Sequence, residues 1–147
     1  MSEVEDEQFL SEFEAQRWPL ERWHHRDHVK LAYLYLVRYG PDEAMTRLRI
    51  GIKGHNAARG IVDSPTGGYH ETMTQAWLRL VHVVLCEYGP TENADAFYEA
   101  HPELSQVKVL RLFYSRELFM SARAKVEFVE PDLAALPKSR SKSGSRK

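Results

Sequence analysis

The stretch that decides the fold is WHHRDHVKLAYLYL, Trp23–Leu36, in which a cluster of histidines precedes a nearly continuous apolar run. Residues three or four apart share one face of a helix, and at this spacing His28 leads into Leu31. The pattern predicts a helix over residues 23–39, which the Gly-Pro pair after it ends. Because this helix is apolar on nearly every side, we expect it to lie at the centre of the fold.

A second stretch, GGYHETMTQAW at Gly67–Trp77, opens another helix in the same way. Its apolar stripe begins at Met73, and counting back three residues places His70 at the top of the buried face, with Glu71 beside it. The pattern predicts a helix over residues 71–88, again ended by a Gly-Pro pair. Two apolar helices therefore begin with histidine.

Apolar residues at helical spacing predict further helices and no convincing strand pair. These are a short helix around Phe9–Phe13 that ends before Trp18-Pro19, a helix over 41–60, a short helix capped by Thr91 or Asn93, and a helix over about 105–124, with VEFVEPDLAALP as an extended segment laid over them. The sequence therefore predicts an all-α fold, a single-domain bundle of five to six mostly antiparallel helices over residues 1–137.

The charge is distributed unevenly along the 147 residues. KSRSKSGSRK, residues 138–147, carries five Lys or Arg and no acid, so removing it from the net charge of −1 leaves −6 for the rest. We expect residues 138–147 to be a solvated, disordered basic tail. The acidic body argues against a domain that binds nucleic acid specifically.

Hydropathy and cysteine content indicate a cytoplasmic protein. The longest apolar run, LAYLYLV, is far shorter than the roughly 20 residues that span a bilayer, so no membrane partner is expected. The acidic start MSEVEDEQ does not resemble a signal peptide. The single cysteine, Cys86, excludes an internal disulfide and a cysteine-based metal site, and it fits a reducing compartment.

The two histidine-led helix beginnings suggest a metal centre. If the helices over 23–39 and 71–88 pack parallel, as an up-down-up-down order would place them, their beginnings meet. That arrangement brings together His25, His28 and His70, with Glu71 nearby. Three imidazoles and a carboxylate suit a divalent metal such as Zn, Fe, Ni or Cu. The spacing also allows His24 to replace His25.

A structural alternative competes with the metal centre. The same histidines would then cap the helix beginnings and hydrogen-bond one another. A helix N-terminus is electropositive and disfavours a cation, which Glu71 and Asp27 would have to offset. Asp27 is also placed to orient a ligand imidazole by a hydrogen bond, without binding the metal itself.

Three further residues are candidates for substrate binding. Asn56 is near the end of the helix over 41–60, which an antiparallel arrangement brings beside the start of the helix over 71–88. Tyr69 either stacks on a substrate or packs in the core, and Arg123 either holds an anion or forms an ordinary salt bridge. His55 is a further ligand in principle, but we expect it at the surface.

The stretches WHHRDH, HNAARG, GYHETMTQAW and FYSRELFMSARAKVEFVEPDLAALP resemble a family of small, mostly bacterial proteins of unassigned function, over most of residues 18–137. The resemblance implies that His25, His28, His70 and Glu71 belong to the recurring pattern. The layout is also similar to the DinB/YfiT-like metal-binding bundles, which use three histidines from two helices. Those proteins carry an HxxxH pair on the later helix, whereas here the pair is on the earlier one.

These observations favour a metal-dependent enzyme that acts on a small-molecule substrate. The metal would lower the pKa of bound water for hydrolysis or group transfer, with Glu71 as a fourth ligand or general base, and Fe or Cu on the same ligands would activate oxygen instead. The alternatives are a non-catalytic module that binds a metal or small molecule, and a helical interaction domain without a ligand. A homodimer is a further possible assembly.

Overall fold

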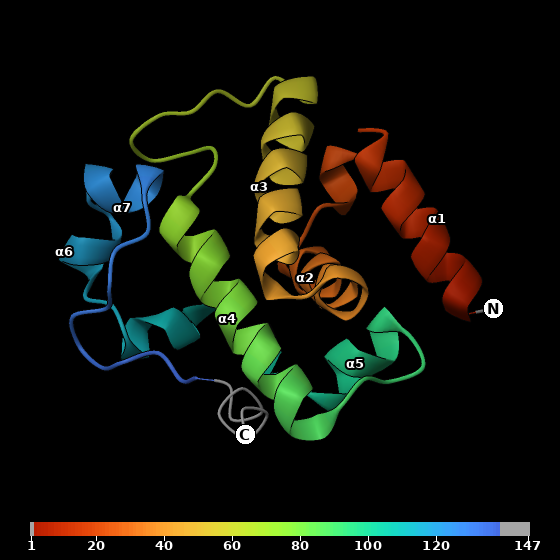
Figure 1. Ribbon diagram of the computed structural model, residues 1–147. Coiled ribbons are helices and arrows are strands. Elements are labelled where there is room, and N and C mark those ends of the chain that lie inside the picture. The colour runs from red at the N-terminus through yellow and green to blue at the C-terminus, as the bar shows by residue number, and fades with distance from the viewer. Residues whose placement is uncertain (1, 139–147) are drawn as a thin grey trace.

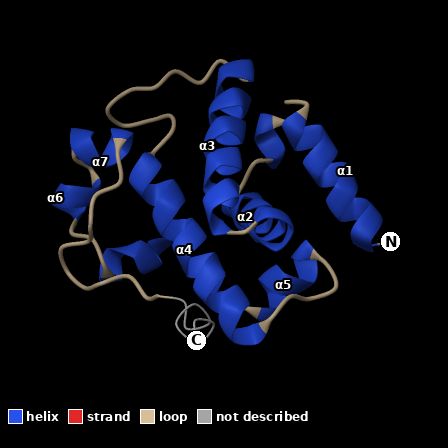
Figure 2. Ribbon diagram, in the orientation of Figure 1, coloured by secondary structure: helices blue, strands red, loops and turns tan. Residues whose placement is uncertain are grey.

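The computed structural model describes residues 2–138 and contains no β-strand among them. The all-α prediction is therefore confirmed, and five of the helices have seven or more residues (Figures 1 and 2). The predicted basic tail lies outside the described residues, apart from Lys138. The elements are α1 (Ser2–Glu14), η1 (Leu20–Arg22), α2 (His25–Tyr39), α3 (Pro41–Ala58), α4 (Glu71–Tyr88), α5 (Ala94–Ala100), η2 (Pro102–Ser105), η3 (Val107–Leu112), α6 (Arg116–Phe119) and α7 (Ala122–Val126).

Helix α2 is the centre of the molecule, as its apolar run predicts. Residues 31–36 are all buried, so every side of the helix is covered, and α3, α4 and α5 all contact it. Figure 1 shows α2 almost end-on, whereas α3 and α4 run across the view. Helix α2 therefore crosses α4 steeply, which differs from the parallel packing that the sequence suggested. Because its middle, residues 31–36, is buried on every side, α2 is held by contacts with several helices at once and does not need to run parallel to α4.

The predicted C-terminal ends of α2 and α4 agree with the structure. Both α2 and α4 stop at a glycine, Gly40 and Gly89, with φ of +84° and +82°. Such angles are costly for residues with a Cβ. The proline after each glycine starts a new direction of the chain, and Pro41 is the first residue of α3.

Helix α1 approaches α3 closely because two residues of α3 lack side chains. A Cβ on Gly51 would lie 2.6 Å from Cε2 of the buried Phe13 ring, and a Cβ on Gly54 would lie 2.6 Å from Nε2 of Gln16. The two glycines therefore allow the end of α1 and the turn that follows it, at Gln16, to rest directly on the α3 backbone.

The long helix predicted over 105–124 is wrong in detail, because this segment forms η3, α6 and α7 instead. Ser115 and Ser121 separate the pieces. The Ser115 hydroxyl accepts the backbone N–H of Leu118, and the Ser121 hydroxyl accepts that of Ala124, each at 3.1 Å. Each serine thus caps a new short helix and breaks the apolar stripe.

The segment after α7 lies across the start of α4, as expected for an extended closing strap. The Thr72 hydroxyl donates to the carbonyl of Glu127 at 3.0 Å and accepts the backbone N–H of Val129 at 3.2 Å. The Tyr114 hydroxyl donates to the carbonyl of Val129 at 2.7 Å. Val129 and Leu136 are buried.

Across the described part of the chain, no helix combines the length and apolar character needed to traverse a membrane.

Candidate functional site

His70 caps the beginning of α4, which explains why this helix opens with histidine. Its Nδ1 accepts the backbone N–H of Met73 at 3.0 Å, and its Nε2–H donates to the carbonyl of Phe119 at 3.0 Å. The ring also stacks on the Phe119 ring, with centroids 4.5 Å apart. Burial lowers the pKa of His70. Both nitrogens of a neutral imidazole are therefore engaged within the protein.

His25 faces the middle of α4 rather than its beginning. Its Nε2–H donates to the carbonyl of Leu104 at 2.7 Å, and its ring packs edge-to-face with Trp77, with centroids 4.5 Å apart. Trp77 follows His70 by seven residues, which is about 10 Å along a helix. The steep crossing of α2 and α4 therefore separates His25 from His70.

The predicted metal centre is not assembled. Within residues 2–138, no group of three or more His, Cys, Asp or Glu side chains is arranged to hold a metal ion. The four predicted ligands are therefore not brought together in this conformation. The physical reasons are the crossing of α2 over α4 and the internal partners of His25, His70 and Glu71.

Glu71 of α4 is a buried carboxylate that pairs with the partly exposed Arg49 of α3. Arg49 donates from Nε to Oε1 at 3.0 Å and from Nη2 to Oε2 at 2.6 Å. The Tyr69 hydroxyl and the Gln75 amide donate to the same carboxylate, each at 2.8 Å. Burial opposes ionisation, but hydrogen bonds from Arg49, Gln75 and Tyr69 outweigh it and lower the pKa of Glu71 to about 2. Such a carboxylate is a poor general base at neutral pH.

His55 is fully buried, which corrects the expectation of a surface position. Its ring stacks on Phe13, with centroids 5.8 Å apart, and lies beside Trp23. Its Nε2–H donates to the carbonyl of Trp18 at 3.2 Å, whereas Nδ1 is sealed from solvent without a partner among the described residues. His55 therefore joins α3 to the segment between α1 and α2.

His28 lies in the first turn of α2, with its ring 6.3 Å from that of Trp23. Burial, and to a smaller degree the neighbouring His25, lower the pKa of His28 to about 4. Its Nε2 is buried, and none of the side chains or backbone groups of residues 2–138 forms a hydrogen bond with it. His28 is therefore a partly buried imidazole that is neutral at pH 7.

The other predicted site residues lie in separate places. Asn56 is half-buried in the last turn of α3, where its carbonyl accepts the backbone N–H of Ile61 at 2.9 Å. Tyr69 is a core residue bonded to Glu71. Arg123 is exposed on α7 and pairs with Glu127 at 2.6 Å. None of these three residues lines any of the main cavities of residues 2–138.

The beginning of α2 is closed by the chain itself. The Asp27 carboxylate accepts the backbone N–H of His24 at 3.0 Å, and the His24 side chain is exposed. Asp27 therefore supports the first turn of α2 and is not hydrogen-bonded to any of the three predicted ligand imidazoles in the described structure.

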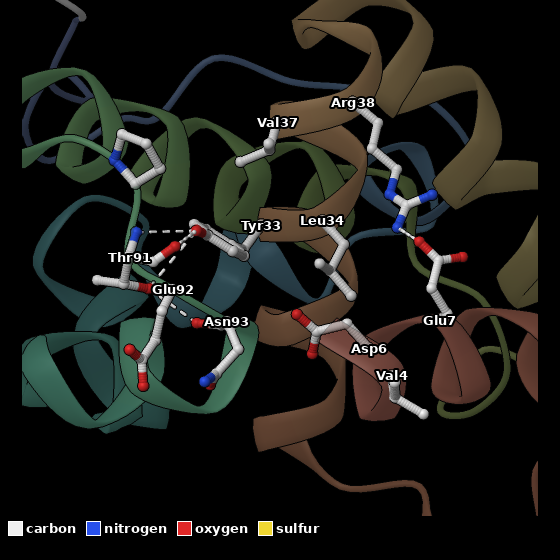
Figure 3. A pocket seen from close by; sticks show the side chains of 11 residues that line it. Val4, Asp6, Glu7, Tyr33, Leu34, Val37, Arg38, Thr91, Glu92 and Asn93 are labelled. Atoms are coloured by element: carbon white, nitrogen blue, oxygen red, sulfur yellow. Dashed lines mark hydrogen bonds and ion pairs between the residues drawn. The ribbon is translucent and has the colours of Figure 1, made fainter. Parts of the chain in front are cut away.

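A cavity of about 560 Å³ lies between α1, α2 and the connection from α4 to α5 (Figure 3). This volume is within the range of small-molecule sites, roughly 300–1,000 Å³. Its wall combines apolar and charged side chains from three distant parts of the sequence. The lining residues are Val4, Asp6, Glu7, Tyr33, Leu34, Val37, Arg38, Pro90, Thr91, Glu92 and Asn93.

Hydrogen bonds fix the side of the cavity formed by the α4–α5 connection. The Tyr33 hydroxyl donates to the carbonyl of Thr91 at 3.1 Å and accepts the backbone N–H of Thr91 at 3.0 Å. The Asn93 side chain accepts the backbone N–H of Ala96 at 2.7 Å and so caps α5. The polar groups on this side are thus engaged in holding the wall in place.

Asp6 is the buried carboxylate of the cavity. Its side chain points away from α1 into the space that Leu34 and Asn93 border (Figure 3). Asp6 is 8% exposed, and its Oδ2 accepts the backbone N–H of Ala94 at 3.1 Å. Burial raises the pKa of Asp6, although the bond from Ala94 and the charge of Lys30 oppose this effect.

The helical spacing of α1 indicates that Asp6 is buried, although the acidic residues around it suggest an exposed position. Asp6 precedes Phe9 by three residues and Phe13 by seven, so it continues the buried stripe of α1. It lies among other acidic residues, and the start of the chain therefore resembles a solvated face.

Comparison with known proteins gives no match for this chain. No family model, no curated protein and no solved structure matches it significantly. The resemblances noted from the sequence motifs therefore stay predictions.

Proposed function

We propose that this protein is a non-catalytic helical module that binds a small molecule in the cavity of Figure 3. The observation that carries this proposal is a cavity of suitable size with a buried carboxylate, Asp6, in its wall. A mostly apolar cavity with a few convergent polar groups and a perturbed pKa is the usual form of a ligand site.

The arrangement of the wall supports the same function. Val4 and Val37 are 65% and 49% exposed at the edge of the cavity, whereas Tyr33 and Asp6 are buried. An apolar ligand body would cover the two valines, and the hydrogen bonds of Tyr33 and Asn93 hold the opposite side in place without the ligand. A site that exists before binding loses little ordering entropy when the ligand arrives.

The metal-dependent enzyme that the sequence suggested has less support. Both imidazole nitrogens of His70 are hydrogen-bonded, and all the bonds described for the Glu71 carboxylate come from groups of the protein itself. A metal would have to displace these internal partners before it could bind there.

Ligand screening by NMR tests the proposed function. We expect at least one compound of a fragment library to shift the backbone amide signals of Val4, Val37 and Thr91 in the ¹⁵N-labelled protein. Val37→Phe fills the edge of the cavity and should abolish these shifts. Val62→Phe, at a position 79% exposed and outside the cavity, is the matched control and should preserve them. Shifts that persist in Val37→Phe, or a library without any binder, contradict the proposal.

A further inference from the structure

Resting on the proposed function, we infer that the ligand of the Figure 3 cavity is an organic ammonium ion with an apolar body. The inference depends on which hydrogen-bonding groups and charges the wall leaves for a ligand. The size of the cavity alone does not determine the chemical class of its ligand.

The charged side chains of the wall are predominantly acidic. Asp6, Glu7 and Glu92 carry negative charge, and Arg38 is the cation among the residues that line the cavity. Arg38 forms an ion pair with Glu7, as Figure 3 shows. Asp6 and Glu92 therefore remain as the charged groups for a ligand, and both are hydrogen-bond acceptors. A ligand that complements them carries N–H donors and positive charge.

Asp6 determines where in the cavity the positive charge of the ligand lies. One of its oxygens accepts the backbone N–H of Ala94, which orients the carboxylate into the cavity. The nearby cations Lys30 and Arg38 do not offset the cost of burying its charge, and the pKa of Asp6 is raised. An ammonium group beside Asp6 would supply the missing compensation, because an opposite charge at short range favours the ionised form.

The remaining wall fits an apolar body. Leu34, Val37 and Pro90 lie on the wall beside the acidic groups, and Val4 faces them from α1. Burial of these side chains favours association by roughly 25 cal/mol for each Å² of apolar surface. A small hydrophilic cation would leave these apolar side chains exposed to water. The acidic groups and the apolar wall together therefore favour an amphipathic amine.

Calorimetric titration with three probes of similar size tests the inference. At pH 7.5 the probes are 2-phenylethylamine, which is a cation, 2-phenylethanol, which is neutral, and phenylacetate, which is an anion. We expect the cation to bind at least about tenfold more tightly than the neutral probe, as charge-assisted hydrogen bonds imply. Phenylacetate should bind most weakly.

Two variants locate the effect. Asp6→Asn keeps an acceptor for Ala94 but removes the charge, and it should abolish most of the advantage of the cation while leaving 2-phenylethanol unchanged. Glu92→Gln provides a second test if Asp6→Asn does not fold. Glu117→Gln removes one charge from an exposed position on α6 and is the matched control.

The outcomes separate this inference from the proposed function. If all three probes bind with similar affinity and Val37→Phe blocks them, the cavity is a ligand site but the ammonium inference is wrong. If the cation is preferred equally in Asp6→Asn, the inference is also wrong. If a broad fragment library gives no binding at the cavity, the proposed function itself fails.

Discussion

Arg49 and Glu71 join α3 to α4 through two hydrogen bonds of 3.0 and 2.6 Å between a guanidinium and a nearly buried carboxylate. A planar guanidinium matches a carboxylate in this two-bond geometry, which lysine cannot reproduce. The pair fixes the first turn of α4 against α3, and Tyr69 and Gln75 complete the set of donors to the carboxylate.

Loss of Arg49 should destabilise the protein strongly. Arg49→Ala leaves the buried Glu71 carboxylate without its charged partner, and we expect the free energy of unfolding to fall by about 2 kcal/mol, less than for a fully buried pair because Arg49 is partly exposed. Urea denaturation measures this change. Arg47→Ala removes an exposed ion pair with Glu43 and a contact with the Tyr39 ring, and it should lower stability much less than Arg49→Ala. Equal effects of the two variants would contradict this account.

His70 should be replaceable at the helix cap by a residue that also caps. His70→Ala removes both hydrogen bonds and should cost about 1–2 kcal/mol of unfolding free energy. His70→Asn keeps a capping acceptor but does not reach Phe119, and its stability should lie between the wild type and His70→Ala. Stoichiometric divalent metal in untagged protein, lost in His70→Ala, would instead restore the metal-centre hypothesis.

The partly buried His28 should make stability depend on pH. Its pKa is about 4 in the folded protein and about 6.5 in the unfolded chain, so the unfolded chain takes up a proton first as pH falls. The contribution of His28 is complete above pH 6.5 and is lost as pH falls to about 4, by up to about 3 kcal/mol. Urea denaturation between these pH values should show a smaller loss for His28→Gln than for the wild type. His24→Gln, at an exposed position of the same helix beginning, should behave like the wild type.

The two glycines of α3 should respond in opposite directions to alanine. Gly51→Ala places a methyl group against the buried Phe13 ring, and the resulting overpacking should lower the unfolding free energy by about 1–2 kcal/mol. Gly54→Ala meets the end of the exposed Gln16 side chain, which can turn away. Because alanine favours a helix by up to about 1 kcal/mol over glycine, Gly54→Ala should raise the melting temperature. A stabilising Gly51→Ala would show that Phe13 moves easily.

Binding of an ammonium ligand should weaken in acid. Asp6 is faced by Lys30 and Arg38 of α2 and by Asp95 of α5, and burial raises its pKa above the ordinary aspartate value. A cation prefers the ionised carboxylate, so its affinity should be full at neutral pH and should fall as pH decreases through the pKa of Asp6. Titration of 2-phenylethylamine from pH 7.5 to pH 4 measures this fall. Asp6→Asn should remove the dependence, and an unchanged slope in that variant would exclude Asp6 as its source.

Local signals were sufficient to predict the main helices. The bounds of α4 agree with the prediction because His70 and the Gly-Pro pair after Tyr88 mark its ends chemically. The single helix predicted over about 105–124 is wrong, because this segment forms η3, α6 and α7. Ser115 and Ser121 cap short helices, and an apolar stripe gave no warning of these two hydrogen bonds.

The candidate site could not be predicted in this way, because it depends on how helices cross. The histidines of α2 and α4 do begin apolar helices, but the steep crossing places His25 against Trp77 and leaves His70 with Phe119. The residues that line the cavity of Figure 3 come from three segments, within 4–7, 33–38 and 90–93. No pattern within any one of these segments indicates that the other two lie beside it.

The two hydrogen bonds of Thr72 have a consequence for how the molecule opens. They join its hydroxyl to Glu127 and Val129, which follow it by 55 and 57 residues, so closing this contact carries a large loop entropy. Contacts of this kind form late and are among the first to be lost in partial unfolding. The amide proton of Val129 should therefore exchange with solvent deuterium well before those of α2, through an opening that leaves the central helices intact.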